Sequence, residues 1–588
     1  MVRLEGAWYN LALSKLPRAL FRAAILGTFC FWAIANWWHA VQEVARFYID
    51  LPVWDYFDTI SHYARYKAAD WSVLWIQHNE HRIVFPEMIF ALDLLMLRGQ
   101  IILPTVLSLC FHFGVWLTMV WAFWKDDAIA PIARYSAIFL GAILIVWKGC
   151  AIALGIPFLM QWTMNQFAAI LALAFLAKLY KSKKAVWLAP LCACGVLCNY
   201  SSGNGLLLWP LLIAIALLLR LPRRQNVILA AVGAVSIGLY FVGYKPLAPL
   251  QWRLLVNHPI YFAEFMASYV SMPFAKLRSG EPLFGVHIGL VSLATLGLFA
   301  FLAWRAKLLK TTTGIVLFGY CATILSCGVM TALGRMNPFD PLLQSPKAPR
   351  YMTEPLTYWS VLAFISIWVT ARYFRFFGTA FATVLAVAIG LLLFRMSHKA
   401  GLNNWYDLEV TNSFANQQWA ALAVENGILD PVPDRILFSD ANYVVAWTPL
   451  MRSERLSLFA KPEVNWIGRD WETVFPEPMR APTEGGIVAS QRLATAVTLA
   501  GWTVARSSLG HPLELVLVDE SHRIVGIGSR LPAGLPERLS KFNISAERQW
   551  SGFVNLDYKS HTVSPYVVSE DGKGLIPLGC SLNVDAVK

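Results

Sequence analysis

Residues 101–124 read IILPTVLSLCFHFGVWLTMVWAFW, a run without a single Lys, Arg, Asp or Glu. As a helix this run is long enough to cross the roughly 30 Å of hydrocarbon in a bilayer. Over the whole chain, 57% of the 588 residues are hydrophobic and only 14% are charged. A soluble domain carries about a quarter charged residues. The sequence therefore predicts an α-helical polytopic membrane protein.

The sequence contains about eleven apolar runs that we expect to span the membrane. They lie at residues 21–41, 101–124, 137–158, 167–177, 185–200, 206–219, 227–243, 284–304, 314–333, 356–370 and 378–394. The fifth and sixth runs are short and flank the polar break Ser201-Ser202-Gly203-Asn204-Gly205. Two half-helices or a re-entrant hairpin are therefore an alternative to two full crossings. We expect the first run to be a retained anchor, because no small-residue cleavage site follows it.

Lys and Arg gather at every second connection between these runs, whereas the connections at 161–166 and 201–205 contain none. The positive-inside rule then places the N-terminus in the cytoplasm. With an odd number of spans, the outer face carries residues 43–100 (the first loop), 245–283, 335–355 and everything after Arg395. The net charge of +13 follows this topology, so we expect membrane lipid as a partner and no nucleic acid.

The composition changes near residue 397 to that of a soluble domain. Alternating apolar and polar residues at 514–519, 523–528 and 552–557 are typical of short antiparallel strands. The run Asp571-Gly572-Lys573-Gly574 predicts a tight hairpin. We divide the chain into a transmembrane part at 1–396, a mixed α/β linker at 397–484 and a β-sandwich domain at 485–588.

Acidic residues concentrate in the first loop, where Asp55 and Asp58 stand in the run Val53-Trp54-Asp55-Tyr56-Phe57-Asp58. Residues three apart share one face of a helix. A carboxylate that aromatic neighbours partly shield from water can have its pKa raised toward the range of a general base. We expect Asp55 to be a catalytic base and Asp58 to contact the substrate. Capping of a juxtamembrane helix in water is an equally weighted alternative.

The run His78-Asn79-Glu80-His81-Arg82 offers a second group of polar side chains in this loop. Two His three residues apart resemble a metal site, but the spacing is not His-Glu-x-x-His and no third ligand is evident. We favour a polar network of Glu80, His81 and Arg82 that anchors the loop or binds an anionic group. A divalent metal stays an open alternative.

Four other places hold polar residues that we expect to contact a substrate. Lys148 stands inside an apolar run, where an ammonium needs a partner such as a lipid phosphate, or an ion pair. Asn204 belongs to the polar break, which could line a cavity or form a simple turn. Arg335 and the pair Arg350-Tyr351 flank one outer connection, where guanidinium groups can bind a phosphate or merely anchor the helix ends.

These features together resemble the GT-C superfamily of integral membrane glycosyltransferases. The residues that carry the resemblance are Trp54-Asp55 with Asp58, His78 to Arg82, Ser202 to Pro210 and Pro349-Arg350-Tyr351, and they also resemble a group of bacterial multi-spanning proteins. The resemblance implies a polyprenyl-phosphate-linked sugar donor, a glycan or lipid-linked acceptor, a catalytic Asp in the first loop and inversion at the anomeric carbon. It also implies the bacterial inner membrane, with the C-terminal domain in the periplasm. No adjacent Asp-Asp or Asp-Glu pair follows the first span, which departs from the best-known GT-C pattern.

Three other functions fit parts of this pattern. A transporter or flippase for a lipid-linked glycan also needs a polar cavity and phosphate-binding Arg, but the hydropathy pattern lacks two matching halves. A glycan polymerase or ligase uses a lipid-pyrophosphate donor and usually Arg with His. A membrane-anchored glycan-binding module would use the C-terminal domain for binding.

Overall fold

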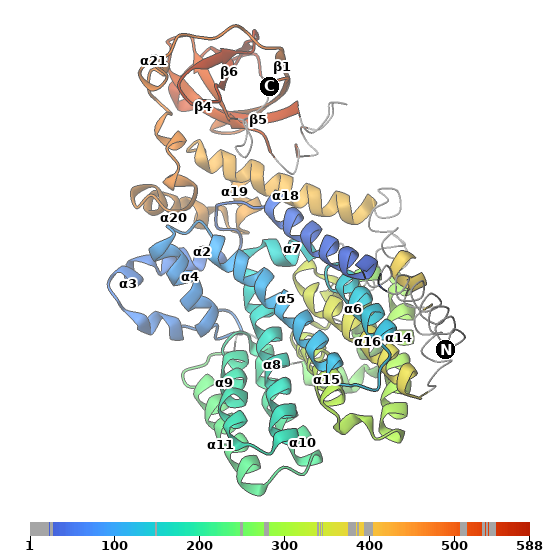
Figure 1. Ribbon diagram of the computed structural model, residues 1–588. Helices are drawn as coiled ribbons and strands as arrows, with labels where there is room; N and C mark the ends of the chain where they lie inside the picture. The colour runs from blue at the N-terminus through green and yellow to red at the C-terminus, as the bar shows by residue number, and fades with distance from the viewer. Residues whose placement is uncertain are drawn as a thin grey trace, which may run out of the picture.

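The structure is a computed structural model with a helical half and a C-terminal β-sheet (Figure 1). It describes residues 23, 27–147, 150–246, 251–275, 282–337, 340, 343, 345–373, 384, 387–392, 404–505, 514–531, 535–536, 539 and 548–587. The prediction of a mainly helical chain that ends in antiparallel strands is confirmed.

Four helices among the described residues are long and apolar enough to cross a membrane. They are α5 (Ile102–Trp124), α8 (Met160–Ser182), α14 (Pro282–Arg305) and α15 (Thr312–Arg335). The remaining helices of this half are one at residues 27–46, α6 (Pro131–Ile145), α7 (Cys150–Gly155), α9 (Leu188–Asn199), α10 (Leu208–Leu218), α11 (Arg223–Tyr240), α12 (Trp252–Asn257), α13 (Pro259–Ala275) and α16 (Thr353–Tyr373). The predicted number of about eleven spans stays a prediction.

One of the predicted spans is interrupted. In the run at 137–158, α6 ends at Ile145 and α7 begins at Cys150. Pro157 then begins a short 3₁₀ helix, Pro157–Leu159, after the end of α7, because proline cannot continue a helix hydrogen-bond ladder. α9 has 12 residues, which reach only about 18 Å. α9 and α10 meet at a 3₁₀ turn, η4 (Gly203–Leu207), and both alternatives for this pair, two half-helices or two full crossings, stay predictions. Residues 161–166, expected in a connection, form the start of α8.

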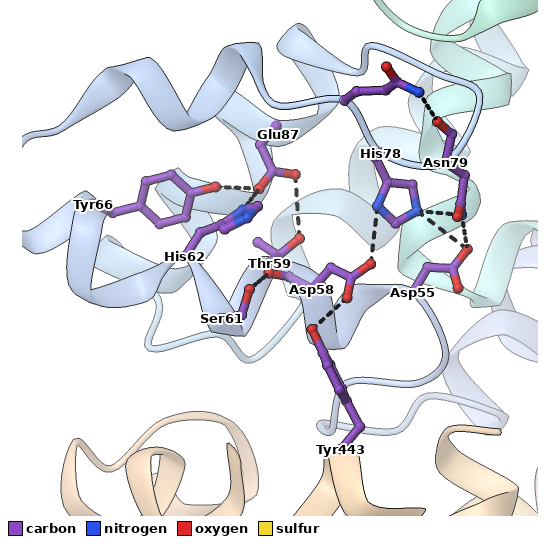
Figure 2. A network of polar contacts seen from close by, with 11 residues as sticks. Asp55, Asp58, Thr59, Ser61, His62, Tyr66, His78, Asn79, Glu87 and Tyr443 are labelled. Carbon is purple, nitrogen blue, oxygen red and sulfur yellow. Dashed lines mark hydrogen bonds and ion pairs between the residues drawn. The ribbon is translucent and has the colours of Figure 1, made fainter. Parts of the chain in front are cut away.

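The first loop folds into the short helices α2 (Tyr56–Ser61), α3 (Tyr63–Lys67), η1 (Trp71–Trp75) and α4 (Val84–Met96). Glu87 of α4 holds these helices together, since its buried carboxylate accepts hydrogen bonds from Tyr66 and from Thr59 at 3.4 Å (Figure 2). His62 Nδ1 lies 3.0 Å from the same carboxylate. The loop is therefore a folded unit with its own polar core.

The segment expected as a mixed α/β linker contains α18 (Asn404–Glu425), α19 (Pro431–Leu437), α20 (Ala441–Ser453) and α21 (Trp471–Val474), with no strand between residues 404 and 484. α18 joins the two halves of the molecule (Figure 1). Phe414 stacks on Phe47 with ring centroids 4.6 Å apart. One turn further on, the indole of Trp419 donates to Thr498 of the sheet at 3.0 Å.

The C-terminal strands form one antiparallel sheet in the order β1-β2-β5-β4-β3-β6-β7, with β8 beside β6. The strands are β1 (Gly485–Arg492), β2 (Ala496–Thr503), β3 (Glu514–Asp519), β4 (Ile524–Ser529), β5 (Gln549–Asn555), β6 (Thr562–Val568), β7 (Leu575–Pro577) and β8 (Leu582–Asn583). The predicted β-sandwich is corrected to a single sheet among the described residues. Alternating apolar and polar residues predict that one face of a strand is buried, but not which element packs on it. Here α18 packs on part of the sheet, with Trp419 against Phe553.

Candidate functional site

A cavity of about 610 Å³ lies where the first loop meets the helical half. Its walls come from the first loop, the start of α8, the turn η4, the end of α11 and the loop that leads into α16. Seven of the residues proposed from the sequence line it, namely Asp55, Glu80, His81, Asn204, Arg335, Arg350 and Tyr351. Residues from four separate parts of the chain therefore share one site.

His78 occupies a central position beside this cavity, between the two aspartates of the first loop (Figure 2). Its Nε2 lies 3.5 Å from Asp55 Oδ2, and its Nδ1 lies 3.2 Å from Asp58 Oδ2. Burial alone would lower the pKa of His78, but the two carboxylates outweigh burial and raise the pKa to about 9. His78 is therefore an imidazolium at neutral pH and donates through both ring nitrogens.

Asp55 presents a free oxygen to the cavity. It precedes α2 at the N-cap position, yet its side chain makes no capping hydrogen bond, unlike the alternative considered from the sequence. His78 and Asn79 both contact Oδ2, and Oδ1 has no hydrogen-bond partner among the described residues. The side chain is 44% exposed, so Oδ1 is accessible to a ligand.

The backbone beside Asp55 is strained. Trp54 has a φ of 56°, in the left-handed region that a bulky residue rarely adopts. Its N–H donates to the carbonyl of Leu437 in α19 at 2.7 Å, which fixes this conformation from the C-terminal segment. The position of Asp55 is therefore set by a contact distant in sequence.

Asp58 lies behind Asp55, outside the cavity lining. Tyr443 of α20 donates to Asp58 Oδ1 at 2.7 Å, and His78 occupies the other oxygen (Figure 2). Burial would raise the pKa of Asp58, but the hydrogen bonds from His78 and Tyr443 lower it below its usual range. The carboxylate is ionised and holds His78 in place, so its contacts are those of a positioning group.

His78 and His81 close a tight turn through two mutual backbone hydrogen bonds of 2.8 Å. Asn79 sits at φ 47°, which Asn tolerates better than most residues. The carbonyl of Glu80 accepts hydrogen bonds from Tyr240 at 3.2 Å and Tyr244 at 3.3 Å. The turn is thereby attached to α11, and the Glu80 side chain is free to face the cavity.

His81 is held in one tautomer by the polar break. The N–H of Gly203 donates to His81 Nδ1 at 3.1 Å. Burial lowers the pKa of His81 to about 4, so the ring is neutral at pH 7. With Nδ1 accepting a hydrogen bond, the ring proton is on Nε2, which makes His81 a hydrogen-bond donor. A Cβ at position 203 would lie only 2.7 Å from His81 Nδ1, so glycine is required here.

Two arginines form the basic part of the cavity wall. Arg335, at the end of α15, lies 3.3 Å from Glu80 Oε1. Arg350 has no carboxylate partner among the described residues, and its guanidinium lies over the ring of Tyr351, 5.2 Å from the centroid. Tyr351 in turn packs against Trp162 of α8. Arg350 is therefore the cation of this wall whose charge is left for a ligand.

Besides Asp58, one further proposed residue within the described part of the chain lies outside the cavity lining. Arg82 is 2% exposed, and its guanidinium donates to the carbonyls of Trp75, Tyr240 and Val242, so it ties the first loop to α11. Lys148 lies outside the described residues. No group of three His, Cys, Asp or Glu side chains within the described part of the chain is arranged to hold a metal ion.

Three features of the site were not predicted from the sequence. They are the hydroxyl of Tyr443, the backbone contact of Leu437 with Trp54, and the cavity residue Gln161. Gln161 lines the cavity and is 2% exposed, and its Oε1 has no partner within the described ranges. A buried amide oxygen without a partner is costly, which marks Gln161 as a residue for a ligand hydroxyl. The sequence did contain a signal for Gln161, because this polar residue stands at the start of an apolar helix, α8.

No protein family model matches this chain, and no curated protein matches it.

Proposed function

We propose that this chain is a membrane glycosyltransferase of the GT-C type, which transfers a sugar from a polyprenyl-phosphate-linked donor to a glycan or lipid-linked acceptor. The observation that carries the proposal is the placing of Asp55 and Arg350 in the wall of one cavity. A reaction of this class needs a carboxylate for the acceptor hydroxyl and a cation for the departing phosphate. The cavity of about 610 Å³ offers both.

The hydrogen-bond pattern favours Asp55 as the general base. His78 already carries a proton at neutral pH, and the free nitrogen of His81 carries the proton of its neutral ring. Glu80 is paired with Arg335. Asp55 retains an unbonded, accessible Oδ1, and its other oxygen is oriented by His78 and Asn79. The same pattern weighs against a ligase that would use one of these histidines as base.

The proposed step is a single displacement. The acceptor oxygen attacks the anomeric carbon while its proton passes to Asp55 Oδ1. The bond from the anomeric carbon to the phosphate oxygen breaks, and the polyprenyl phosphate leaves with the electron pair. Arg350, aided by Arg335, neutralises the charge that develops on this phosphate. Attack opposite the leaving group inverts the anomeric centre.

The finer topology belongs to the same proposal. About eleven spans would place the N-terminus in the cytoplasm and the cavity at the outer face of a bacterial inner membrane. The C-terminal sheet would then be periplasmic and lie beside an incoming glycan. A reporter active only outside the cytoplasm should be active when it is fused after residue 394 and silent after Lys184. The reverse result would contradict this topology.

The decisive test is Asp55→Asn in the full-length protein. Transfer from a panel of polyprenyl-phosphate hexoses and pentoses should fall by roughly 10² to 10⁴, the scale of losing a positioned general base. Donor binding, followed by native mass spectrometry, should persist. Asp70→Asn is the matched control, because Asp70 lies in the same loop, its side chain is 42% exposed, and among the described residues this side chain bonds to Arg65 and Ser72 alone.

Glu80→Gln decides between the two acids of the wall. Loss of transfer in Glu80→Gln together with full activity of Asp55→Asn would move the base to Glu80. A protein that binds the donor lipids but transfers no sugar in any assay would instead support the transporter alternative.

A further inference from the structure

A second cavity lies far from the site described above, at the end of the helical half that faces away from the β-sheet (Figure 1). Its volume is about 700 Å³. Apolar residues of α10 and α15 form most of its wall, among them Leu211, Ile215 and Phe318. The end of α14 and the connection between α14 and α15 complete the wall of the cavity with Trp304, Lys307 and Lys310. We call it the basic groove.

The connection that carries the two lysines is fixed. Lys307 has a φ of 56° and precedes a short 3₁₀ turn, η5 (Leu308–Lys310). Thr311 then caps α15, since its hydroxyl accepts from the N–H of Gly314 at 3.0 Å. Both lysines are exposed. Their ammonium groups are therefore presented at the edge of the groove by a defined turn.

The charge around the basic groove is unbalanced. α10, α11, α14 and α15 contain no Asp or Glu, while Arg220, Arg223, Arg224 and Arg305 stand near the same ends of these helices. An isolated anion at this place would meet several cations, and no carboxylate lines the groove within the described part of the chain. An apolar wall next to these cations also fits a hydrocarbon chain.

A comparison within the molecule sharpens the argument. Another groove of about 610 Å³ runs between α6, α14 and α16, and its lining contains no Lys or Arg. Both grooves can take hydrocarbon, but the basic groove alone of these two adds ammonium groups at one end. The basic groove is therefore complementary to an amphiphile with an anionic head.

We propose that the basic groove binds an anionic phospholipid of the bilayer, with an acyl chain along α10 and α15 and the phosphate beside Lys307 and Lys310. The inference does not depend on the sugar-transfer reaction. It uses only the groove, the charges of its rim and the four apolar helices that fit a membrane.

The test is native mass spectrometry of the full-length protein released from mixed micelles of phosphatidylglycerol and phosphatidylcholine with equal acyl chains. The wild type should retain phosphatidylglycerol with a preference of roughly tenfold or more, since two ammonium groups face the anionic headgroup. The double variant Lys307→Gln and Lys310→Gln should lose this preference. Ala322→Phe, which fills the groove and keeps both lysines, should lower retention of both lipids.

The matched control is Lys181→Gln with Lys183→Gln. These lysines end α8, lie outside the groove and include a residue at φ 58°, the same backbone region as Lys307. The control should keep the preference. The proposal is overturned if the wild type shows no preference or if the control loses as much as the groove variant. Displacement of the lipid by free glycerol phosphate would also overturn it, because the site would then bind a soluble phosphate.

Discussion

The hydroxyl of Tyr443 donates a hydrogen bond to Asp58 at 2.7 Å, although 385 residues separate the two in the sequence. Asp58 contacts His78, and His78 contacts Asp55. The C-terminal segment therefore acts on the first loop through a chain of three polar contacts. Tyr443 touches neither the cavity nor any proposed substrate group, so its expected role is to position the acid that faces the cavity.

Tyr443→Phe removes the hydrogen bond to Asp58 together with the contacts of the hydroxyl with Ser61 and Trp447. The pKa of Asp58 should rise, because the phenol hydrogen bond is one of the contacts that lower it. The acid limb of the pH–activity profile should then move to higher pH, with a turnover loss of roughly tenfold. Tyr63→Phe is the matched control at the same interface, where the hydroxyl lies 3.4 Å from Glu454. An unchanged pH profile would contradict the positioning role.

Arg350→Ala should weaken donor binding more than it slows the chemical step, since a phosphate contact exists before and during the reaction. We expect KM for the donor to rise by roughly tenfold or more. Arg350→Lys should recover only part of the affinity, because an ammonium cannot bind phosphate through two parallel hydrogen bonds. Kinetics at varied donor concentration separate these effects. A fall in kcat at constant KM would place Arg350 elsewhere in the mechanism.

The His78 imidazolium should make folding stability depend on alkaline pH. Its pKa is raised from 6.5 to about 9, so its stabilising contribution is complete below about pH 6.5 and is lost as pH rises through 9. The melting temperature of the wild type in detergent should fall across this range. His78→Gln should show a lower melting temperature at pH 6 and a weaker decline. His522→Gln, at an exposed His in the turn between β3 and β4, serves as control.

Gly203→Ala should disturb the tautomer of His81. The new methyl group would lie 2.7 Å from His81 Nδ1, closer than a Cβ contact allows. We expect a destabilisation of about 1–3 kcal/mol and reduced transfer. Gly334→Ala is the matched control, because Gly334 also lines the cavity but a methyl group there would meet no atom within 4 Å. Equal melting temperatures for both variants would show that the contact relaxes at no cost.

Asp434 of α19 should limit stability at neutral and alkaline pH. Its side chain is fully buried, and neither carboxylate oxygen has a partner within the described part of the chain. Burial raises its pKa to about 7, so the folded state loses stability as pH rises from about 4 through 7. Asp434→Asn should therefore raise the melting temperature at pH 8 more than at pH 5. The exposed Asp557→Asn should change neither value.

The sequence predicted much of the local structure. β3 begins and ends at the expected residues, 514 and 519, although the strand is buried on both faces and not on one face as alternation suggests. α5 begins within one residue of the expected start of its apolar run. Composition alone could not show that the run at 137–158 is interrupted between Ile145 and Cys150, or that α18 covers one face of the sheet.

The site was predicted in its parts but not in its connections. Acidic and basic residues at expected membrane boundaries were a sufficient signal for Asp55, Glu80, Arg335 and Arg350, which share the cavity. Arg82 shows the same kind of signal and yet is used to tie backbone carbonyls together. Contacts such as Tyr443 with Asp58 leave no local pattern, because the two residues meet only after the chain has folded.

The attachment of the first loop to α19 and α20 has a consequence for biosynthesis. Translation produces every cavity-lining residue, up to Tyr351, before Leu437 and Tyr443 leave the ribosome. During that interval Asp55 stands on a loop that lacks its backbone anchor to Leu437 and the contact of Tyr443 with Asp58. The site is therefore completed late in synthesis. A chain released before Leu437 and Tyr443 are made would keep its apolar helices but would lack the contacts that position Asp55.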